Sequence, residues 1–250
     1  MLFSLFIFTW FAGSIFYVFK LRGDARYVSF TQYLRKSWPI FAPFNSVLYL
    51  FTRKQAQGAF IDPAQYKNLH VIKDNYQTIL EEAKALFDNG NFCQTNEPGS
   101  PGYYDVGFRT FFKYGWSKFY LNWYGYQHES AKRLCPKTQA ILAQIPEVKG
   151  AMFSILPPHS QLTIHSDPLA CSLRYHFGLM VPNSPECFIN VDNKSKHWMD
   201  GEGFIFDETF PHFVRNDTDQ HRLILMCDVE RPMSWPGRVF NYFYGFLVRT

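Results

Sequence analysis

The 250-residue sequence lacks the features that mark several common classes of protein. Its net charge is only +4 and it contains no run of lysine and arginine, which argues against a nucleic-acid-binding surface. Its five cysteines are scattered and never form a C-x-x-C pair, which disfavours a zinc ribbon or a thioredoxin-like site and favours a reducing compartment. There is no internal repeat and no low-complexity linker. One globular domain with an appendage is therefore expected at this length.

The first 19 residues lack any charged side chain, although 18% of the whole sequence is charged. A helix of this length covers roughly 28 Å, close to the roughly 30 Å hydrocarbon core of a bilayer. The basic residues Lys20, Arg22 and Arg26 follow the apolar run, which favours an uncleaved anchor over a secretory signal peptide. By the positive-inside rule they also predict that the rest of the chain is cytoplasmic.

Two further aromatic segments are candidates for membrane contact. Residues 39–51 are too short to span a bilayer and predict either an interfacial or re-entrant helix or a helix packed on the domain. Residues 240–247, flanked by Arg238 and Arg249, are equally consistent with an interfacial segment and with docking into the core. We therefore expect four parts: an anchor (1–19), a membrane-proximal basic and interfacial segment (20–60), a main domain (61–230) and an aromatic C-terminal segment (231–250).

The main domain changes from a helical to a β pattern along the chain. A helix is predicted from Asp62 to about Asn89, with Asp62 and Pro63 as its start and Asn89-Gly90 as its end, and a second helix over residues 130–145. Residues 91–126 predict strands and hairpins. From Lys149 to Glu230, short apolar runs alternate with turn signals, which is typical of a β-sandwich or jelly roll.

The histidines concentrate in this β half, and two of them have informative neighbours. His165 and Asp167 are two residues apart, and Pro168 favours an extended backbone at Asp167, so both side chains would leave one face of a strand. His212 follows a predicted strand at 203–207 and could approach as a third ligand. Two histidines and one carboxylate are the ligand set of non-haem Fe(II) oxygenases. The H-x-D spacing alone is weak evidence, since such pairs are usually hydrogen-bonded or lie at the surface.

Two cations in the same region predict a binding site for an acid. Arg222 opens the apolar run RLILMC, and a buried arginine needs a carboxylate partner, which a bound dicarboxylate could supply through a bidentate contact. An ion pair with one of the 21 acidic residues is the alternative. Arg174 and His176, again two residues apart, offer a cation and an imidazole to one cavity, although each could instead be a satisfied core group.

Over residues 153–228 these motifs resemble the aspartyl/asparaginyl β-hydroxylase family of Fe(II)- and 2-oxoglutarate-dependent dioxygenases. The motifs that carry the resemblance are FS at Phe153-Ser154, HSDP, SLRYHFGL, WMDGEGFIFDETFPH and HRLIL. Within the family the chain is more similar to the bacterial lipid A acyl-chain hydroxylases, which also have an N-terminal hydrophobic anchor, a basic RG segment (Arg22-Gly23) and an aromatic APxNxxxYLF stretch (42–51). The likeness then covers nearly the whole chain.

The resemblance implies a mainly β fold, a double-stranded β-helix (jelly-roll) core with flanking helices. It implies that Fe(II) is bound by His165, Asp167 and His212. The animal peptide hydroxylases of the family have glycine at the position of Asp167, and the aspartate here restores the full triad. It further implies 2-oxoglutarate and O₂ as cosubstrates, with Arg222 and Ser154 holding the distal carboxylate of 2-oxoglutarate and Arg174 and His176 lining its other end near the metal.

The resemblance also implies a substrate and a location. The substrate would be lipid A or its precursor, hydroxylated on a secondary acyl chain at the carbon next to the carbonyl. The enzyme would lie at the cytoplasmic face of the bacterial inner membrane, in contact with membrane lipids. There are three alternatives: a peptide aspartyl/asparaginyl β-hydroxylase, a tethered hydroxylase of a soluble substrate, and a non-enzymatic, membrane-tethered jelly-roll binding module. The binding module predicts loss of at least one iron ligand, whereas all three are present.

Overall fold

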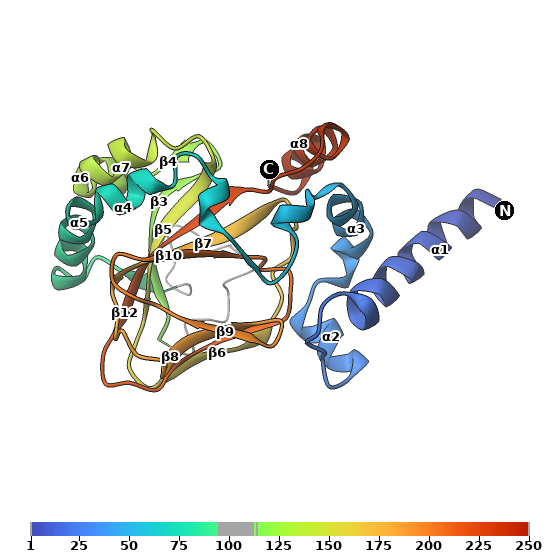
Figure 1. Ribbon diagram of the computed structural model, residues 1–250, viewed down its shortest axis with the longest axis horizontal. Coiled ribbons are helices and arrows are strands. Elements are labelled where there is room, and N and C mark those ends of the chain that lie inside the picture. Colours follow the sequence, from blue (N-terminus) through green and yellow to red (C-terminus); the bar gives the residue numbers. More distant parts are fainter. Residues whose placement is uncertain (1, 95–112, 114, 250) are drawn as a thin grey trace.

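The computed structural model describes residues 2–94, 113 and 115–249, and its centre is a sandwich of two antiparallel β-sheets (Figure 1). Eight consecutive strands form the sandwich: β5 (Val148–Leu156), β6 (Ser160–His165), β7 (Ser172–Met180), β8 (Cys187–Val191), β9 (Lys194–His197), β10 (Gly203–Phe206), β11 (His212–Asn216) and β12 (Arg222–Glu230). They alternate between the two sheets except at the hairpin β8-β9, which lies wholly in the small sheet. The large sheet contains the order β10-β7-β12-β5, and the small sheet has the order β6-β11-β8-β9. This strand order is that of a jelly roll, so the predicted fold class is confirmed.

The two sheets differ in how much of each strand is buried. Strands β7 and β12 of the large sheet are buried along nearly their whole length, because the small sheet covers one face and helices cover the other. In the small sheet, burial alternates along β8, where Cys187, Ile189 and Val191 point into the sandwich. Two apolar cores result, one between the sheets and one between the large sheet and its helices.

Short strands extend the large sheet at both edges. They are β1 (Phe60–Ile61) beside β10, and β3 (Ser117–Trp123) with β2 (Cys93–Gln94) beside β5, while β4 (Tyr126–Gln127) pairs with β3. The predicted strands of residues 91–126 are therefore confirmed where the structure describes them. Residues 95–112 and 114 of that stretch lie outside the described residues.

Both predicted helices of the main domain are broken. The first consists of a 3₁₀ turn at Pro63–Gln65, α4 (His70–Asp74) and α5 (Tyr76–Asp88), because Asn75 leaves the helical conformation between α4 and α5. The second is divided into α6 (Glu129–Leu134) and α7 (Pro136–Leu142) at Cys135. Proline disfavours a helical conformation in the residue before it, and Pro136 therefore starts a new helix.

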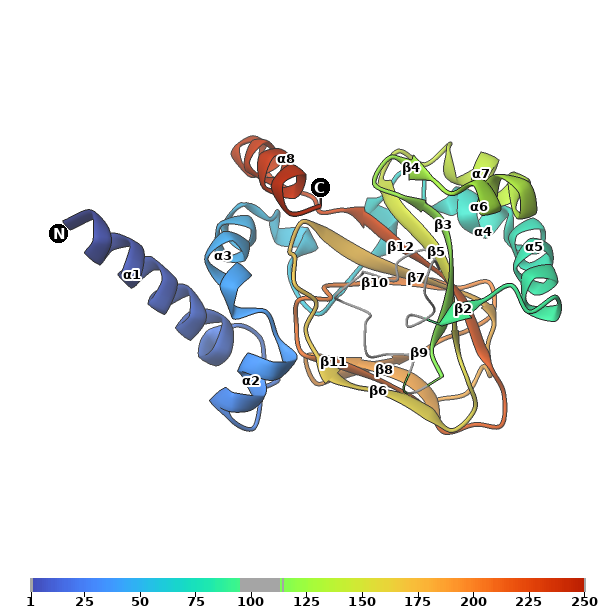
Figure 2. The same cartoon turned by 180° about the vertical axis from the view of Figure 1, so that it is seen from behind.

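The N-terminal part lies at one end of the sandwich (Figures 1 and 2). Helix α1 (Leu2–Phe16) continues into a π-helical turn, η1 (Tyr17–Leu21). Together they form a 20-residue stretch, almost entirely exposed, that is long and apolar enough to cross a membrane. Helix α2 (Phe30–Lys36), the 3₁₀ turn η2 (Pro39–Phe41), helix α3 (Ala42–Phe51) and the 3₁₀ turn η3 (Lys54–Ala56) connect it to the main domain.

Helix α3 packs between α1 and the C-terminal helix α8 (Trp235–Arg249). The Phe44 ring lies against Trp10 of α1, with ring centroids 5.7 Å apart, and stacks on Tyr244 of α8 at 5.2 Å. One face of α3, including Asn45 and Leu48, is buried on the domain. One face of the segment 39–51 is therefore packed on the domain, as one of the two alternatives predicts. On its other face Ile40 and Leu50 are apolar and exposed.

Candidate active site

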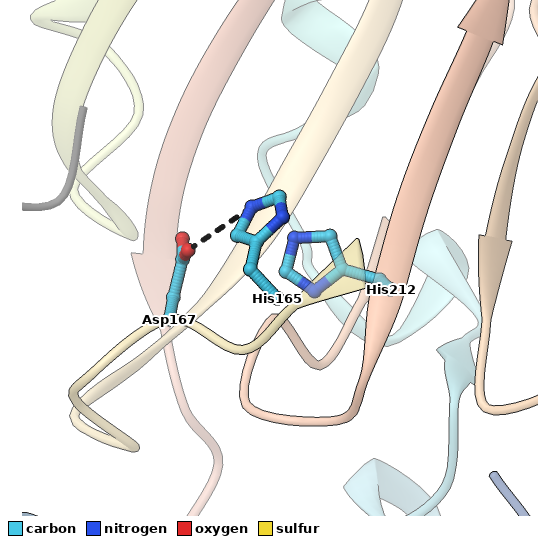
Figure 3. A group of neighbouring side chains, drawn as sticks. All are labelled: His165, Asp167 and His212. Carbon is cyan, nitrogen blue, oxygen red and sulfur yellow. Dashed lines mark ion pairs between the residues drawn. The ribbon is translucent and has the colours of Figure 1, made fainter. Parts of the chain in front are cut away.

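His165, Asp167 and His212 meet at the ends of two neighbouring strands of the small sheet. His165 ends β6, His212 begins β11, and the two are direct partners in the antiparallel ladder. Asp167 lies just beyond the end of β6 rather than on the strand itself. One ligand atom from each side chain lies within 4.8 Å of the other two (Figure 3). Among the described residues, no other group of three His, Cys, Asp or Glu side chains is arranged in this way.

Backbone carbonyls orient both imidazoles. The Nδ1 atom of His165 lies 2.7 Å from the Thr163 carbonyl oxygen, and Nδ1 of His212 lies 2.9 Å from that of Phe210. If Nδ1–H donates to these carbonyls, Nε2 carries the lone pair in each ring. Nε2 of His165 faces Oδ1 of Asp167 at 3.7 Å. The orientation suits metal binding, which needs an unprotonated ring nitrogen from each histidine.

Burial keeps both histidines neutral. It lowers the pKa of His165, and burial together with the neighbouring His165 lowers the pKa of His212 to about 4. A metal ion therefore does not have to displace a proton from either ring near neutral pH. Two neutral imidazoles and one carboxylate fit a divalent cation.

Arg174 on β7 fixes the direction of the Asp167 carboxylate. Its guanidinium contacts Oδ2 of Asp167 at 2.9 Å and Oδ1 of Asp228 at 3.1 Å. Although burial opposes the charge, Asp228 and Asp167 raise the pKa of Arg174 above its usual range. Because Oδ2 is held by Arg174, Oδ1 of Asp167 points towards His165 and can act as a single-atom ligand.

Arg222, the first residue of β12, is a buried cation whose charge is not compensated within the described part of the chain. Its guanidinium donates to Oγ of Ser154 on β5 at 3.2 Å and packs on the Trp198 ring at 4.7 Å. No described acidic side chain forms an ion pair with Arg222, and its Nε has no hydrogen-bond acceptor among the described residues. Burial lowers the pKa of Arg222 to about 10. A ligand carboxylate would supply the missing partner.

One cavity between the sheets, with about 430 Å³ of atom-free space including its opening, joins these groups. All seven residues predicted from the sequence line it, namely Ser154, His165, Asp167, Arg174, His176, His212 and Arg222. Apolar side chains such as Leu162, Ile189 and Val214 complete its wall. His176 stacks on Trp198, and burial together with Arg222 lowers its pKa well below the usual value. Neither ring nitrogen of His176 has a hydrogen-bond partner in the described part of the chain, so both are available for hydrogen bonds to a bound ligand.

Sequence reasoning missed two residues that shape this cavity. Trp198 supports both Arg222 and His176, although it stands in the connection between β9 and β10. Asp228 is the second carboxylate on Arg174 and lies directly across the ladder from it. The only signal for Asp228 is its spacing of six from Arg222, which places both on the same face of β12.

Comparisons with known proteins find related hydroxylases. Residues 73–232 match the family model described as aspartyl/asparaginyl beta-hydroxylase. The "ornithine lipid ester-linked acyl 2-hydroxylase" of Rhizobium tropici is 38% identical over 128 residues, which are 51% of this chain and 46% of that protein. The "aspartyl/asparaginyl beta-hydroxylase" of Homo sapiens is 30% identical over 177 residues, 68% of this chain and 21% of that protein. The chain thus matches less than half the length of either relative.

A solved structure, a Pseudomonas putida prolyl-4-hydroxylase, aligns with 74% of this chain and 99% of its own at 12% identity and a TM-score of 0.44. The match to the family model covers well over half of the 250 residues and includes the strands that carry His165, His212 and Arg222. The chain belongs to the aspartyl/asparaginyl β-hydroxylase family.

Proposed function

We propose that this protein is an Fe(II)- and 2-oxoglutarate-dependent hydroxylase that acts on an acyl chain of a membrane lipid, at the carbon next to the carbonyl. The observation that carries the proposal is a single cavity lined both by a His/Asp/His cluster and by a buried arginine without an acidic partner among the described residues. The first group suits a divalent metal, and the second suits the carboxylate of an organic acid.

In this proposal His165, Asp167 and His212 hold Fe(II), which with 2-oxoglutarate and O₂ supplies the oxidising power for C–H hydroxylation. Arg222 and Ser154 bind the distal carboxylate of 2-oxoglutarate. The chain itself orients the metal-binding side chains and excludes water. Arg174 directs Asp167, backbone carbonyls direct the two imidazoles, and the apolar wall of the cavity keeps solvent from the reacting C–H.

Two observations support a lipid substrate. The relative from Rhizobium tropici is named for 2-hydroxylation of an ester-linked acyl chain of ornithine lipid. Independently, the stretch Leu2–Leu21 is apolar enough to hold the domain at a bilayer. The resemblance of the sequence favours lipid A, or its precursor, with hydroxylation of a secondary acyl chain.

We further propose that the protein is anchored in the bacterial inner membrane by α1, with the domain on the cytoplasmic side. Lys20, Arg22 and Arg26 follow the span, as the positive-inside rule requires for a cytoplasmic domain. The division into anchor (1–19), membrane-proximal segment (20–60), dioxygenase domain (61–230) and C-terminal segment (231–250) belongs to the same proposal. A reporter active only in the periplasm, fused after Thr250, should be silent, and activity of that reporter would contradict the topology.

The decisive experiment is mass spectrometry of lipids from a bacterial host that makes both lipid A and ornithine lipid. Cells expressing the wild-type protein should gain one oxygen, about 16 Da, on a lipid A acyl chain. His212→Ala should abolish the gain, whereas His197→Ala, an exposed histidine on β9, should leave it unchanged. A gain on ornithine lipid alone would keep the reaction and change the substrate. No gain on any lipid, with wild-type protein present in the membrane, would contradict lipid hydroxylation.

A peptide substrate is the second candidate. It rests on the 30% identity to the human aspartyl/asparaginyl beta-hydroxylase over 68% of this chain. Purified protein with Fe(II) and 2-oxoglutarate would be incubated with peptides containing Asp and Asn. Succinate formation stimulated by peptide, but not by lipid, would favour this alternative.

A further inference from the structure

The segment that leaves the candidate membrane span makes direct contact with the loop that precedes His212. Arg22, 8% exposed, donates to Oδ2 of Asp207 at 2.7 Å and stacks on the Phe210 ring at 3.6 Å. Asp207 and Phe210 both lie between the end of β10 and His212. Arg22 thus contacts Phe210, and the Phe210 carbonyl orients the imidazole of His212, a proposed metal ligand.

The next residues are tied to the same loop through Asp192. Oδ1 of Asp192 accepts hydrogen bonds from the backbone N–H groups of Asp24, at 2.6 Å, and Ala25, at 2.7 Å. The backbone N–H of Asp192 in turn donates to the carbonyl of Pro211, the residue before His212, at 3.0 Å. The chain from Arg22 to Ala25 is thus tied both to Asp207 and, through Asp192, to Pro211.

Residues farther along the segment hold the other two ligands. Ser166 stands between His165 and Asp167 in the sequence, and its backbone N–H donates to the Lys36 carbonyl at 2.8 Å. Its hydroxyl lies 2.7 Å from the buried Tyr27 hydroxyl. Lys36 also donates to Oγ1 of Thr163, whose carbonyl orients His165, at 3.1 Å.

Asn45 of α3 binds the backbone just after Asp167. Its side-chain amide donates to the Pro168 carbonyl at 2.8 Å and accepts from the Ala170 N–H at 3.0 Å. Asn45 is 6% exposed, so these bonds are shielded from water. Figure 2 shows the whole segment, from the end of α1 through α2 to α3, beside the ends of β6 and β11.

We infer that residues 22–45 form a clamp that positions the metal ligands, so that the membrane-proximal segment is a working part of the catalytic centre as well as a link to the anchor. The inference rests on the proposed function and deepens it. The clamp contacts both ligand-bearing loops, and the backbone N–H of Asp167 joins those loops by donating to the Glu208 carbonyl at 2.9 Å. Arg22 and Tyr27 are positioning residues: they act through Phe210 and Ser166 and do not touch the metal themselves.

The test is metal affinity of the full chain in lipid nanodiscs, measured under anaerobic conditions by the visible absorption of bound Co(II). Arg22→Met and Tyr27→Phe should each weaken Co(II) binding about tenfold or more, as expected for residues that orient ligands. Arg22→Lys should restore part of the affinity, because lysine keeps the charge opposite Asp207 but loses the planar stack on Phe210. The control Arg53→Met removes an exposed cation just beyond the clamp and should bind like wild type.

Turnover gives a second readout. Because Arg222 lies outside the clamp, kcat should fall in Arg22→Met and Tyr27→Phe while the KM for 2-oxoglutarate stays constant. If Arg22→Met fails to fold, as judged by thermal unfolding without metal, Tyr27→Phe, which loses only a hydroxyl, decides the question. Unchanged Co(II) affinity in the folded variants, with binding lost in His212→Ala, would overturn the clamp alone. Wild-type Co(II) affinity in His212→Ala would overturn the metal centre itself, and the clamp with it.

Discussion

Arg222 has opposite effects on binding and on stability. It is fully buried, and in the described part of the chain its guanidinium has a hydroxyl and an indole ring as neighbours but no carboxylate. A buried charge without a counter-ion opposes folding, but the same charge binds an anionic ligand strongly because water is excluded. The residue is therefore expected to contribute to function at the expense of stability.

Arg222→Met should show both effects. We expect 2-oxoglutarate to bind about tenfold to a hundredfold more weakly, since a charge-assisted hydrogen bond contributes roughly 1.5–3 kcal/mol. Without cosubstrate, the variant should unfold at a higher temperature than wild type. Calorimetric titration and thermal unfolding would measure the two effects, with Arg215→Met, at an exposed position of β11, as the control. Unchanged affinity for 2-oxoglutarate would remove Arg222 from the cosubstrate site.

Gly23 is the residue at which the chain turns after the apolar stretch Leu2–Leu21. Its φ is +71°, and a Cβ at this position would overlap the Asp192 carboxylate and come within 2.6 Å of the Phe210 ring. Both the conformation and the available space therefore exclude a side chain.

Gly23→Ala should reduce the free energy of unfolding by about 2–4 kcal/mol, through strain and overpacking combined. Gly90→Ala is the matched control, because Gly90 has a similar φ of +64° but open space around its Cβ position. It should reduce the free energy of unfolding by only about 1 kcal/mol. Equal losses in the two variants, measured by chemical denaturation, would show that close packing around Gly23 is unimportant.

At the scale of elements, α8 has two apolar faces with different uses. Phe240 and Tyr244 pack on the core beside α3. On the outer face, five apolar side chains between 48% and 73% exposed recur every three or four residues: Trp235, Val239, Tyr242, Phe243 and Phe246. Helix α3 packs against both α8 and the candidate membrane span, and an aromatic stripe in this position suits the interface of a bilayer. The packed face agrees with docking of residues 240–247 onto the core, while the interfacial alternative stays a prediction for the exposed face.

The predicted interfacial position of α8 can be tested with its own tryptophan. In proteoliposomes containing lipids brominated near the headgroup, Trp235 should be strongly quenched. The bromolipid-quenched part of the fluorescence should therefore shrink in Trp235→Phe. Trp198→Phe should leave the quenched part unchanged, because Trp198 is only 1% exposed. Equal quenching of wild type and Trp235→Phe would place α8 away from the bilayer.

A network of charged side chains connects the N-terminal segment to β6, β7, β10 and β12 or to residues just beyond these strands. Arg231 and Arg22 both contact Oδ2 of Asp207 and lower the pKa of that carboxyl below its usual range, although burial opposes this. Glu208, in contrast, has a strongly raised pKa, chiefly because it is buried. The three carboxylates of Asp167, Asp207 and Asp228 balance the three guanidinium groups of Arg22, Arg174 and Arg231. The clamp is part of this balance through Arg22.

At the scale of the whole molecule, the proposed metal links segments that are far apart in the sequence. His165 and His212 stand on neighbouring strands, and the clamp adds residues from the N-terminal part. A ligand that binds only the folded state stabilises it in proportion to its occupancy. Metal binding should therefore stabilise the sandwich and the membrane-proximal segment together.

We expect Co(II) at a hundredfold excess over its dissociation constant to stabilise the protein by about 2.7 kcal/mol, which corresponds to roughly 5–11 °C in Tm for a chain of this size. A chelator should reverse the shift. His212→Ala should show no shift, while the exposed His197→Ala should behave like wild type. A shift of equal size in His212→Ala would mean that the metal binds elsewhere.

The sequence by itself determined the fold class and the residues that line the site. Short apolar runs between turn signals specify strands, and inward-facing positions on those strands must carry His176, Arg174 and Arg222 into the interior. Local signals also placed an apolar helix at the N-terminus. They failed at Asn75 and Cys135, where one predicted helix became two, because hydrophobic spacing persists across a break that the backbone requires.

Only the tertiary structure decided which residues are partners. Asp207 and Arg22 are 185 residues apart, Tyr27 and Ser166 are 139 apart, and no local pattern couples such positions. The lack of an acidic partner for Arg222 among the described residues is likewise visible only once its neighbours are assembled, because 21 acidic residues in the sequence were available to pair with it. Ion pairing and ligand orientation depend on distances of a few ångströms, and these are set by the packing of whole elements against each other.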